Sequence, residues 1–327
     1  MFNFHLSYKW LYFSKPSGPP HPVPEGLQRA WIETSTGRLE VIYAEPERCA
    51  SKPPVFFCHG GMGGAWVWTE YMQYLAARGV ACYAISLRGH GDSWYPSYFR
   101  MVYLTTRRML TNDLVAGIKW AEARAKSEVV LVGHSSGGGL SQDILSKQEV
   151  HVKGLALLGA VPSQGSLGVY INWAKLDPWF TVRMLFHGWH SNSPLSHPVL
   201  TQRAFFGSKF PLASVVPFQE RISRYESFLW PISMMWPFAT PSTVLQQIQD
   251  SKQGTARLLV MAGSEDKLMN TRETEDLTAL YRSVETVNSS QVQMEFVEGA
   301  GHHLQNDIQW EDGAVKLFQF YQKLLTA

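Results

Sequence analysis

The sequence predicts an α/β fold in which a mostly parallel central sheet is flanked by helices and carries an inserted helical cap. Short apolar runs alternate with segments of helical periodicity on both sides of the middle of the chain, which is typical of βαβ units. Between about residues 163 and 250 the alternation stops, and tryptophan and proline become frequent. We therefore expect an N-terminal arm (1–27), a core formed by 28–162 and 251–327, and a helical cap (163–250).

The expected strands and helices follow from hydrophobic periodicity. The first two strand-like runs, joined by Ser35-Thr36-Gly37, predict a hairpin. The later runs are short and unbroken, as expected of parallel strands that are covered on both faces. Strand-like runs lie at 28–34, 38–45, 55–58, 80–85, 128–132, 152–158, 257–262 and 292–297. Helical spacing covers 66–78, 105–126, 137–147, 270–283 and 307–325.

The composition is that of a globular protein with a highly aromatic interior. A chain of 327 residues can bury roughly three quarters of the surface that its unfolded form exposes. Aromatic residues make up 13% of the chain and charged residues 17%, against a usual charged fraction of about 25%. The formal net charge is +2 and no basic block occurs, which argues against nucleic acid as a partner. The oligomeric state stays open, a homodimer included.

The N-terminal segment 1–13 is aromatic but does not have the pattern of a secretory signal peptide. It lacks a basic start, and His, Ser and Lys interrupt its apolar residues. No apolar run in the chain approaches the roughly 18 residues that span a bilayer, so we expect no integral membrane segment. The segment is expected to pack on the domain, with shallow contact to a membrane surface as the alternative.

The three cysteines, Cys49, Cys58 and Cys82, are odd in number and lack metal-binding spacing. Cys58 and Cys82 lie in strand-like apolar runs, so we expect buried free thiols. Free thiols suit a reducing, cytoplasmic compartment. We expect neither a metal nor an organic cofactor.

The most informative stretch is Gly133-His134-Ser135-Ser136-Gly137, between a strand-like run and a helical one. This context predicts a nucleophile elbow, a sharp turn that lifts the Ser135 hydroxyl to the carboxyl edge of the sheet. A side chain two residues to either side would collide with the turn, which accounts for Gly133 and Gly137. Ser136 cannot replace Ser135, because its own −2 neighbour is His134. The alternative is an ordinary glycine-rich turn, although the spacing fits neither common nucleotide-binding motif.

A second glycine cluster, at 60–64, follows the strand-like run 55–58. Glycines let the backbone approach a ligand closely and leave amides free to donate. We expect the backbone N–H of Gly61 and that of Ser136 to form an oxyanion hole, with Met62 as the competing donor. A phosphate-binding loop is the alternative interpretation.

A serine hydroxyl needs a base, and the histidine of a serine triad needs an acidic partner. His302 follows the last strand-like run in a glycine-containing loop and is preferred to His303. Asp266 lies in the loop after the run 257–262, with Glu265 and Asp250 as alternatives. The order serine, aspartate, histidine is the one expected on such a sheet.

Together these motifs resemble the α/β-hydrolase fold family, from about residue 28 to the end of the chain apart from the cap. The resemblance implies that the cap shapes the substrate pocket and that the loop Arg88–Ser93 is structural. Relatives that are dehalogenases or epoxide hydrolases have aspartate at the elbow, so Ser135 argues against both activities. The motifs are His59-Gly60-Gly61 with Trp66, Ser86–Ser93, the elbow, Gly263–Asp266 and Gly299–His302.

The expected activity is that of a serine hydrolase that cleaves an ester or lactone of a bulky apolar small molecule through an acyl-enzyme. Acyl transfer or C–C bond hydrolysis with the same triad is one alternative. A ligand-binding, receptor-like protein with a vestigial site is another. The cap residues expected to contact ligand, or simply to pack, are Tyr170, Trp173, Arg183, His187 and Tyr225.

Overall fold

The computed structural model describes residues 4–47, 52–249, 256–284 and 289–326 and has an eight-stranded sheet at its centre. The strand order is β1-β2-β4-β3-β5-β6-β7-β8. β2 is antiparallel to β1 and β4, and the other pairs are parallel. The mostly parallel sheet of the sequence prediction is therefore confirmed. The strands are β1 Gln28–Thr34, β2 Gly37–Ala44, β3 Val55–Cys58, β4 Cys82–Ser86, β5 Val130–His134, β6 Gly154–Leu158, β7 Leu258–Gly263 and β8 Val292–Val297.

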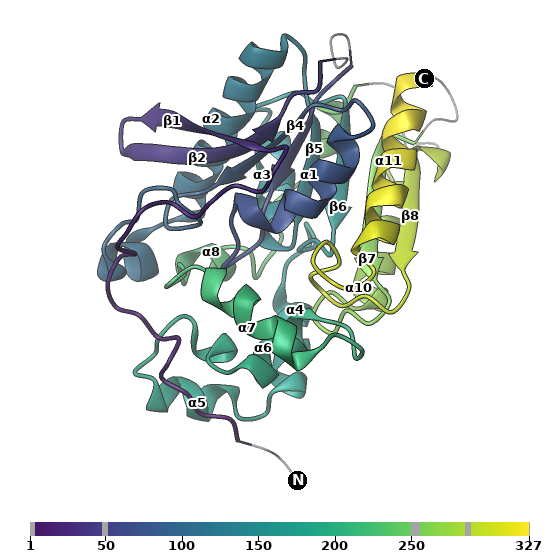
Figure 1. Ribbon diagram of the computed structural model, residues 1–327. Coiled ribbons are helices and arrows are strands. Elements are labelled where there is room, and N and C mark those ends of the chain that lie inside the picture. Colours follow the sequence, from purple (N-terminus) through teal and green to yellow (C-terminus); the bar gives the residue numbers. More distant parts are fainter. Residues whose placement is uncertain (1–3, 48–51, 250–255, 285–288, 327) are drawn as a thin grey trace.

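Helices cover both faces of this sheet (Figure 1). Helix α1 packs against α11, and α2 packs against α3, which in turn contacts the short helix α9. All residues of the five strands β3 to β7 are buried, as the unbroken apolar runs predicted. The helices are α1 Thr69–Ala76, α2 Arg107–Ala125, α3 Ser136–Ser146, α9 Pro241–Gln246, α10 Thr271–Arg282 and α11 Trp310–Thr326.

The prediction of a single helix over 66–78 is wrong in its first turn. The structure has a 3-10 helix, η1 (Ala65–Trp68), followed by α1. All four η1 residues are buried, whereas the one-sided helix predicted from the spacing would expose part of this turn. The Thr69 hydroxyl donates to the Trp66 carbonyl at 3.1 Å and stabilises the junction.

Between β6 and β7 the chain forms a group of short helices that lie together below the sheet in Figure 1. No strand occurs among the described residues of 163–249. Residues of α4, α6 and α8 face the turn after β5 across a shared cavity. The helices of this segment are α4 Leu167–Leu176, α5 Phe180–Phe186, η3 Ser193–Leu195, α6 Pro198–Phe205, α7 Leu212–Arg221 and α8 Leu229–Ile232; the remaining short helices of the chain are η2 Arg100–Leu104 and η4 Ser289–Gln291.

The N-terminal segment before β1 runs across these helices and reaches α5 (Figure 1). The His190 imidazole is 2.9 Å from the carbonyl of Tyr12, and the Tyr8 hydroxyl donates to the carbonyl of Phe186 at 3.0 Å. Within the described ranges, none of the helices combines the length and the apolar character that a membrane crossing requires.

Cys58 and Cys82 are buried free thiols, as predicted, and burial raises the pKa of both. Cys49 lies outside the described residues. The two thiols are therefore part of the core and not of a site.

Arg183 of α5 is fully buried and joins the N-terminal segment to the helices between β6 and β7. Its guanidinium forms an ion pair with Asp177 and donates to the carbonyl of His5 at 2.7 Å. It also lies 5.6 Å from the centre of the Phe4 ring. The guanidinium thus contacts both the N-terminal segment and Asp177, which assigns Arg183 a structural role.

Replacing this buried arginine should destabilise the protein strongly. In Arg183→Met the Asp177 carboxylate remains buried without its cation, a loss of about 3–5 kcal/mol of unfolding free energy. The matched control is Arg108→Met, which breaks an exposed ion pair with Glu149 at a cost of about 0.2–1 kcal/mol. Urea denaturation measures both, and equal losses would contradict the assignment.

Candidate active site

Ser135 occupies a sharp turn between β5 and α3. Its φ is 53° and its ψ is −126°, a combination that non-glycine residues adopt at a cost of order 1–3 kcal/mol. A Cβ on Gly133 would lie 2.6 Å from the Cα of Gly138, and a Cβ on Gly137 would collide with main-chain carbonyls of Cys58 and His59. Both glycines are therefore needed for the steric reason that the sequence suggested.

The structure brings Ser135, His302 and Asp266 together from three loops at the carboxyl edge of the sheet. The Nε2 atom of His302 is 3.0 Å from Ser135 Oγ, and its Nδ1 atom is 2.8 Å from Asp266 Oδ2. A carboxylate has no proton to donate, so the hydrogen bond to Asp266 places the ring proton on Nδ1. The lone pair of Nε2 is then free to accept the serine proton. The residues Ser135, His302 and Asp266 are 9%, 2% and 4% exposed, respectively.

Backbone groups hold the carboxylate of Asp266 in place. Its Oδ1 accepts the N–H groups of Leu268 and Met269 at 2.8 and 2.9 Å. Gly159, at the end of β6, gives the pair its space, since a Cβ there would lie 3.2 Å from Asp266 Oδ2 and 3.4 Å from His302 Nδ1. Sequence reasoning missed Gly159, although its place after a buried strand was the available signal.

The described residues predicted as an alternative base and an alternative acid do not join this series of hydrogen bonds. The Nδ1 atom of His303 is 3.1 Å from Asn306 Oδ1, and burial lowers the pKa of His303 to about 3, so its ring is neutral. Glu265 accepts the N–H of Ser208 at 2.6 Å and its hydroxyl proton at 3.1 Å, at the surface. Asp250 lies outside the described residues.

A further histidine, His134, supports the loop that carries His302, the predicted base. Its Nε2–H donates to the main-chain carbonyl of His302 at 2.9 Å. Burial, and then the nearby histidines, lower the pKa of His134 well below its usual value. A neutral ring therefore stabilises the loop without adding a charge beside the base.

The residues of the two predicted oxyanion donors lie close to each other beside the serine. Gly61 and Ser136 both line the cavity at Ser135, and a Cβ on Gly61 would lie 3.9 Å from Ser136 Oγ. Ser136 is the first residue of α3, and the first amides of a helix have no partner within it. The competing amide, that of Met62, donates to Glu226 at 2.7 Å.

Two adjoining cavities lie between the sheet and the helices that connect β6 to β7. The first, of about 110 Å³, surrounds Ser135 and His302. The second, of about 540 Å³, is lined mostly by apolar side chains, many of them from α4, α5, α8 and η2. The residues common to both linings are Met62, Tyr170, Trp173, Glu226 and Pro231.

The cap residues that the sequence singled out divide into two groups. Tyr170 and Trp173 line both cavities. Arg183 has the structural partners given above, His187 Nδ1 is 2.9 Å from Ser193 Oγ, and Tyr225 donates its hydroxyl proton to the carbonyl of Pro96 at 2.8 Å. In the part of the chain that the structure describes, no group of three or more His, Cys, Asp or Glu residues could hold a metal ion.

A family model described as the alpha/beta hydrolase fold matches residues 53–307, and the chain belongs to this family. The resemblance seen in the sequence is thereby confirmed. Solved structures share the fold at low identity. The 2-hydroxy-6-oxo-6-phenylhexa-2,4-dienoate hydrolase of Rhodococcus sp. strain RHA1 is 16% identical with a TM-score of 0.62, and the match covers 90% of this chain and 99% of that one.

Two further structures are similar to the same extent. Carboxylesterase CesB of Bacillus subtilis is 17% identical with a TM-score of 0.59, over 91% of this chain and 92% of that one. The enol-lactonase of Burkholderia xenovorans LB400 is 13% identical with a TM-score of 0.60, over 90% and 100%. At these identities the likeness establishes the shared fold.

The close backbone packing at the Ser135 turn predicts that Gly137→Ala destabilises the protein. Its Cβ would collide with the carbonyls of Cys58 and His59, and we expect a loss of about 3 kcal/mol of unfolding free energy. Gly79→Ala is the control, because Gly79 has a φ of +77° but no atom within 4 Å of an added Cβ. The Gly79→Ala protein should lose only about 1 kcal/mol of unfolding free energy. Urea midpoints compare the two, and a harmless Gly137→Ala would contradict the close packing.

Proposed function

We propose that this protein is a serine hydrolase that cleaves an ester or lactone of a bulky apolar small molecule. The observation that carries the proposal is the continuous hydrogen-bonded series from Ser135 through His302 to Asp266, at 3.0 and 2.8 Å. A buried base with an oriented tautomer beside a strained serine is the arrangement that nucleophilic catalysis needs.

The reaction follows from this geometry. Ser135 Oγ bonds to the substrate carbonyl carbon while its proton passes to His302 Nε2, and Asp266 stabilises the imidazolium. The carbonyl oxygen becomes an oxyanion, which the N–H groups of Gly61 and Ser136 stabilise. The C–O bond then breaks, and the leaving oxygen takes the proton from His302. Water, deprotonated by the same imidazole, hydrolyses the acyl-enzyme and restores the serine.

The cavities support the choice of substrate. The space at Ser135 is small, whereas the adjoining cavity of about 540 Å³ is apolar, and apolar walls favour ligands that bury most of their surface. We propose that the segment 163–250 acts as a cap that binds the apolar part of the ester, while the scissile carbonyl lies in the smaller space.

Single substitutions at the triad should abolish turnover. We expect Ser135→Ala to lower kcat by about 10⁶-fold and Asp266→Asn by about 10⁴-fold, because the asparagine favours the wrong histidine tautomer. Hydrolysis of p-nitrophenyl esters and labelling with a fluorophosphonate probe measure both. Glu265→Gln, one residue from the acid, should retain full activity.

Full activity or stoichiometric labelling in Ser135→Ala would refute the assignment of the nucleophile. Product analysis with an added alcohol or thiol tests the reaction type: free acid as the only product indicates hydrolysis, and a new ester or thioester indicates transfer. A C–C bond hydrolase would cleave a suitable ketone and leave these esters intact.

The apolar cavity predicts a preference for long acyl or alcohol chains. Each buried methylene contributes about 0.8 kcal/mol, so kcat/KM should rise by up to about fourfold per methylene between acetate and octanoate esters. Ile232, half exposed, lines the cavity, and Ile232→Trp should flatten this dependence. Ile308→Trp, on an equally exposed residue away from both cavities, is the control. An unchanged chain-length series in Ile232→Trp would contradict the placement of the chain.

A further inference from the structure

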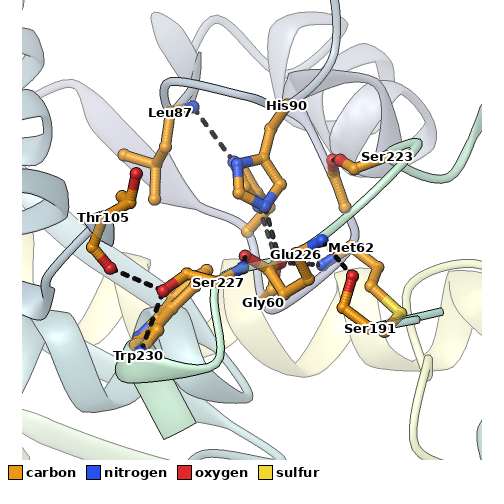
Figure 2. Close-up of polar contacts among 12 residues, drawn as sticks. Gly60, Met62, Leu87, His90, Thr105, Ser191, Ser223, Glu226, Ser227 and Trp230 are labelled. Carbon is orange, nitrogen blue, oxygen red and sulfur yellow. Dashed lines mark hydrogen bonds and ion pairs between the residues drawn. The ribbon is translucent and has the colours of Figure 1, made fainter. Parts of the chain in front are cut away.

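The segment 223–228 between α7 and α8, here called the strap, lies against the loop 59–64, here called the oxyanion loop (Figure 2). The N–H of Ser223 donates to the carbonyl of Met62 at 2.9 Å. The N–H of Met62 donates to Glu226 Oε2 at 2.7 Å. Both main-chain polar groups of Met62 are therefore bound by the cap.

Met62 has a left-handed backbone conformation, with φ at 63°. For a residue with a side chain this costs roughly 1–2 kcal/mol. Its neighbours Gly61 and Gly63 impose little restriction of their own. The conformation persists because the strap holds the residue from both sides, which is the expected state of strained backbone at a functional loop.

The preceding peptide is held by His59. Its Nδ1 is 2.7 Å from the carbonyl oxygen of Gly60, and its Nε2 accepts the N–H of Leu87 at 3.1 Å. The ring is therefore neutral with its proton on Nδ1, and burial lowers the pKa of His59 well below its usual value. Because a trans peptide is planar, the N–H of Gly61 points opposite to the Gly60 carbonyl. His59 thus sets the direction of the proposed oxyanion donor.

Glu226 binds the loop as one half of a buried ion pair. His90 Nε2 is 2.7 Å from Glu226 Oε2, and His90 Nδ1 is 2.9 Å from the carbonyl of Arg88. Both ring nitrogens face acceptors, so each carries a proton when Glu226 is ionised. Burial lowers the pKa of His90, but the Glu226 charge and the hydrogen bonds outweigh it and raise the net pKa. The imidazolium balances the carboxylate beside a site where an oxyanion forms.

The rest of the strap is fixed to the core and the cap. The Ser227 hydroxyl donates to the carbonyl of Thr105 at 2.5 Å, and the N–H of Phe228 donates to the carbonyl of Val102 at 2.9 Å. The N–H of Glu226 itself donates to Ser191 Oγ at 2.8 Å. The carboxylate therefore has a fixed origin from which to hold the loop.

From these contacts we propose that Glu226 is a positioning residue for the oxyanion hole. It holds the peptide between Gly61 and Met62 so that the Gly61 N–H, aimed by His59, stays directed at the oxyanion. His90 supplies the counter-charge. The proposal rests on the proposed hydrolase function and assigns to the cap a part in catalysis besides binding substrate.

The test compares Glu226→Gln and Glu226→Ala with Glu220→Gln, an exposed carboxylate at the end of α7. Alanine removes every acceptor, and we expect kcat to fall about 100-fold, the size of effect that misplacing one donor produces. Glutamine keeps one oxygen for the Met62 N–H and should lose about 10-fold. KM should change less than about twofold in both variants, and Glu220→Gln should match the wild type.

A transition-state analogue separates positioning from general damage. A trifluoromethyl ketone accepts the Ser135 oxygen at its carbonyl carbon, its own oxygen becomes an oxyanion, and the serine proton passes to His302. Its inhibition constant should rise by the same factor as kcat/KM falls in each Glu226 variant. An ether of the same shape, which forms no oxyanion, should bind all four proteins equally.

Several results would overturn the proposal. These are an unchanged kcat in Glu226→Gln, a trifluoromethyl ketone that binds the variants as well as the wild type, or equal weakening of the ether. Circular dichroism checks folding, and the isosteric Glu226→Gln decides if Glu226→Ala does not fold. A wild-type protein that neither hydrolyses esters nor reacts with the fluorophosphonate would instead refute the proposed function, and this proposal with it.

Discussion

The site depends on backbone packing that leaves no room for a Cβ atom at Gly60 or Gly137. A Cβ on Gly60 would lie 2.6 Å from the Cβ of Ser135, and one on Gly137 would collide with the carbonyls of Cys58 and His59. The serine turn and the oxyanion loop therefore meet main chain against main chain. This contact fixes the distance between the hydroxyl and the amides, because neither loop can move without the other.

Much of this arrangement could be predicted from the sequence because the constraints are local. Glycines around Ser135 report a steric requirement within five residues of chain, and the loops of Asp266 and His302 follow directly from buried strands. Parallel strands end at one edge of a sheet, so loops that are distant in sequence were expected to meet there. The fold and the meeting of these three side chains followed from such signals.

The contacts that sequence reasoning missed are non-local or depend on orientation. Glu226 lies 164 residues from Met62, in a cap segment without a motif, and nothing in the local pattern distinguishes it from the other acidic residues of the cap. The neutral state of His134 follows from burial and from three neighbouring histidines, which only the folded chain brings together. The break between η1 and α1 likewise reflects burial on all sides, which overrides the one-sided periodicity that predicts a single helix.

The distribution of charge around the base has a consistent physical logic. His59, His134 and His303 are buried, and burial lowers the pKa of each, so they contribute shape and hydrogen bonds without charge. The nearby His90 is paired with Glu226, and against the lowering effect of burial the Glu226 charge and hydrogen bond raise the pKa of the imidazole. In a medium of low dielectric constant an unpaired charge acts on its surroundings more strongly than it does in water. The segment between β6 and β7 brings the Glu226 carboxylate to His90, and the same carboxylate oxygen also accepts the Met62 N–H. Under the proposed function, binding of the cap and alignment of the oxyanion loop are therefore one interaction, and we expect loosening of the cap to weaken transition-state stabilisation even where the proposed triad stays intact.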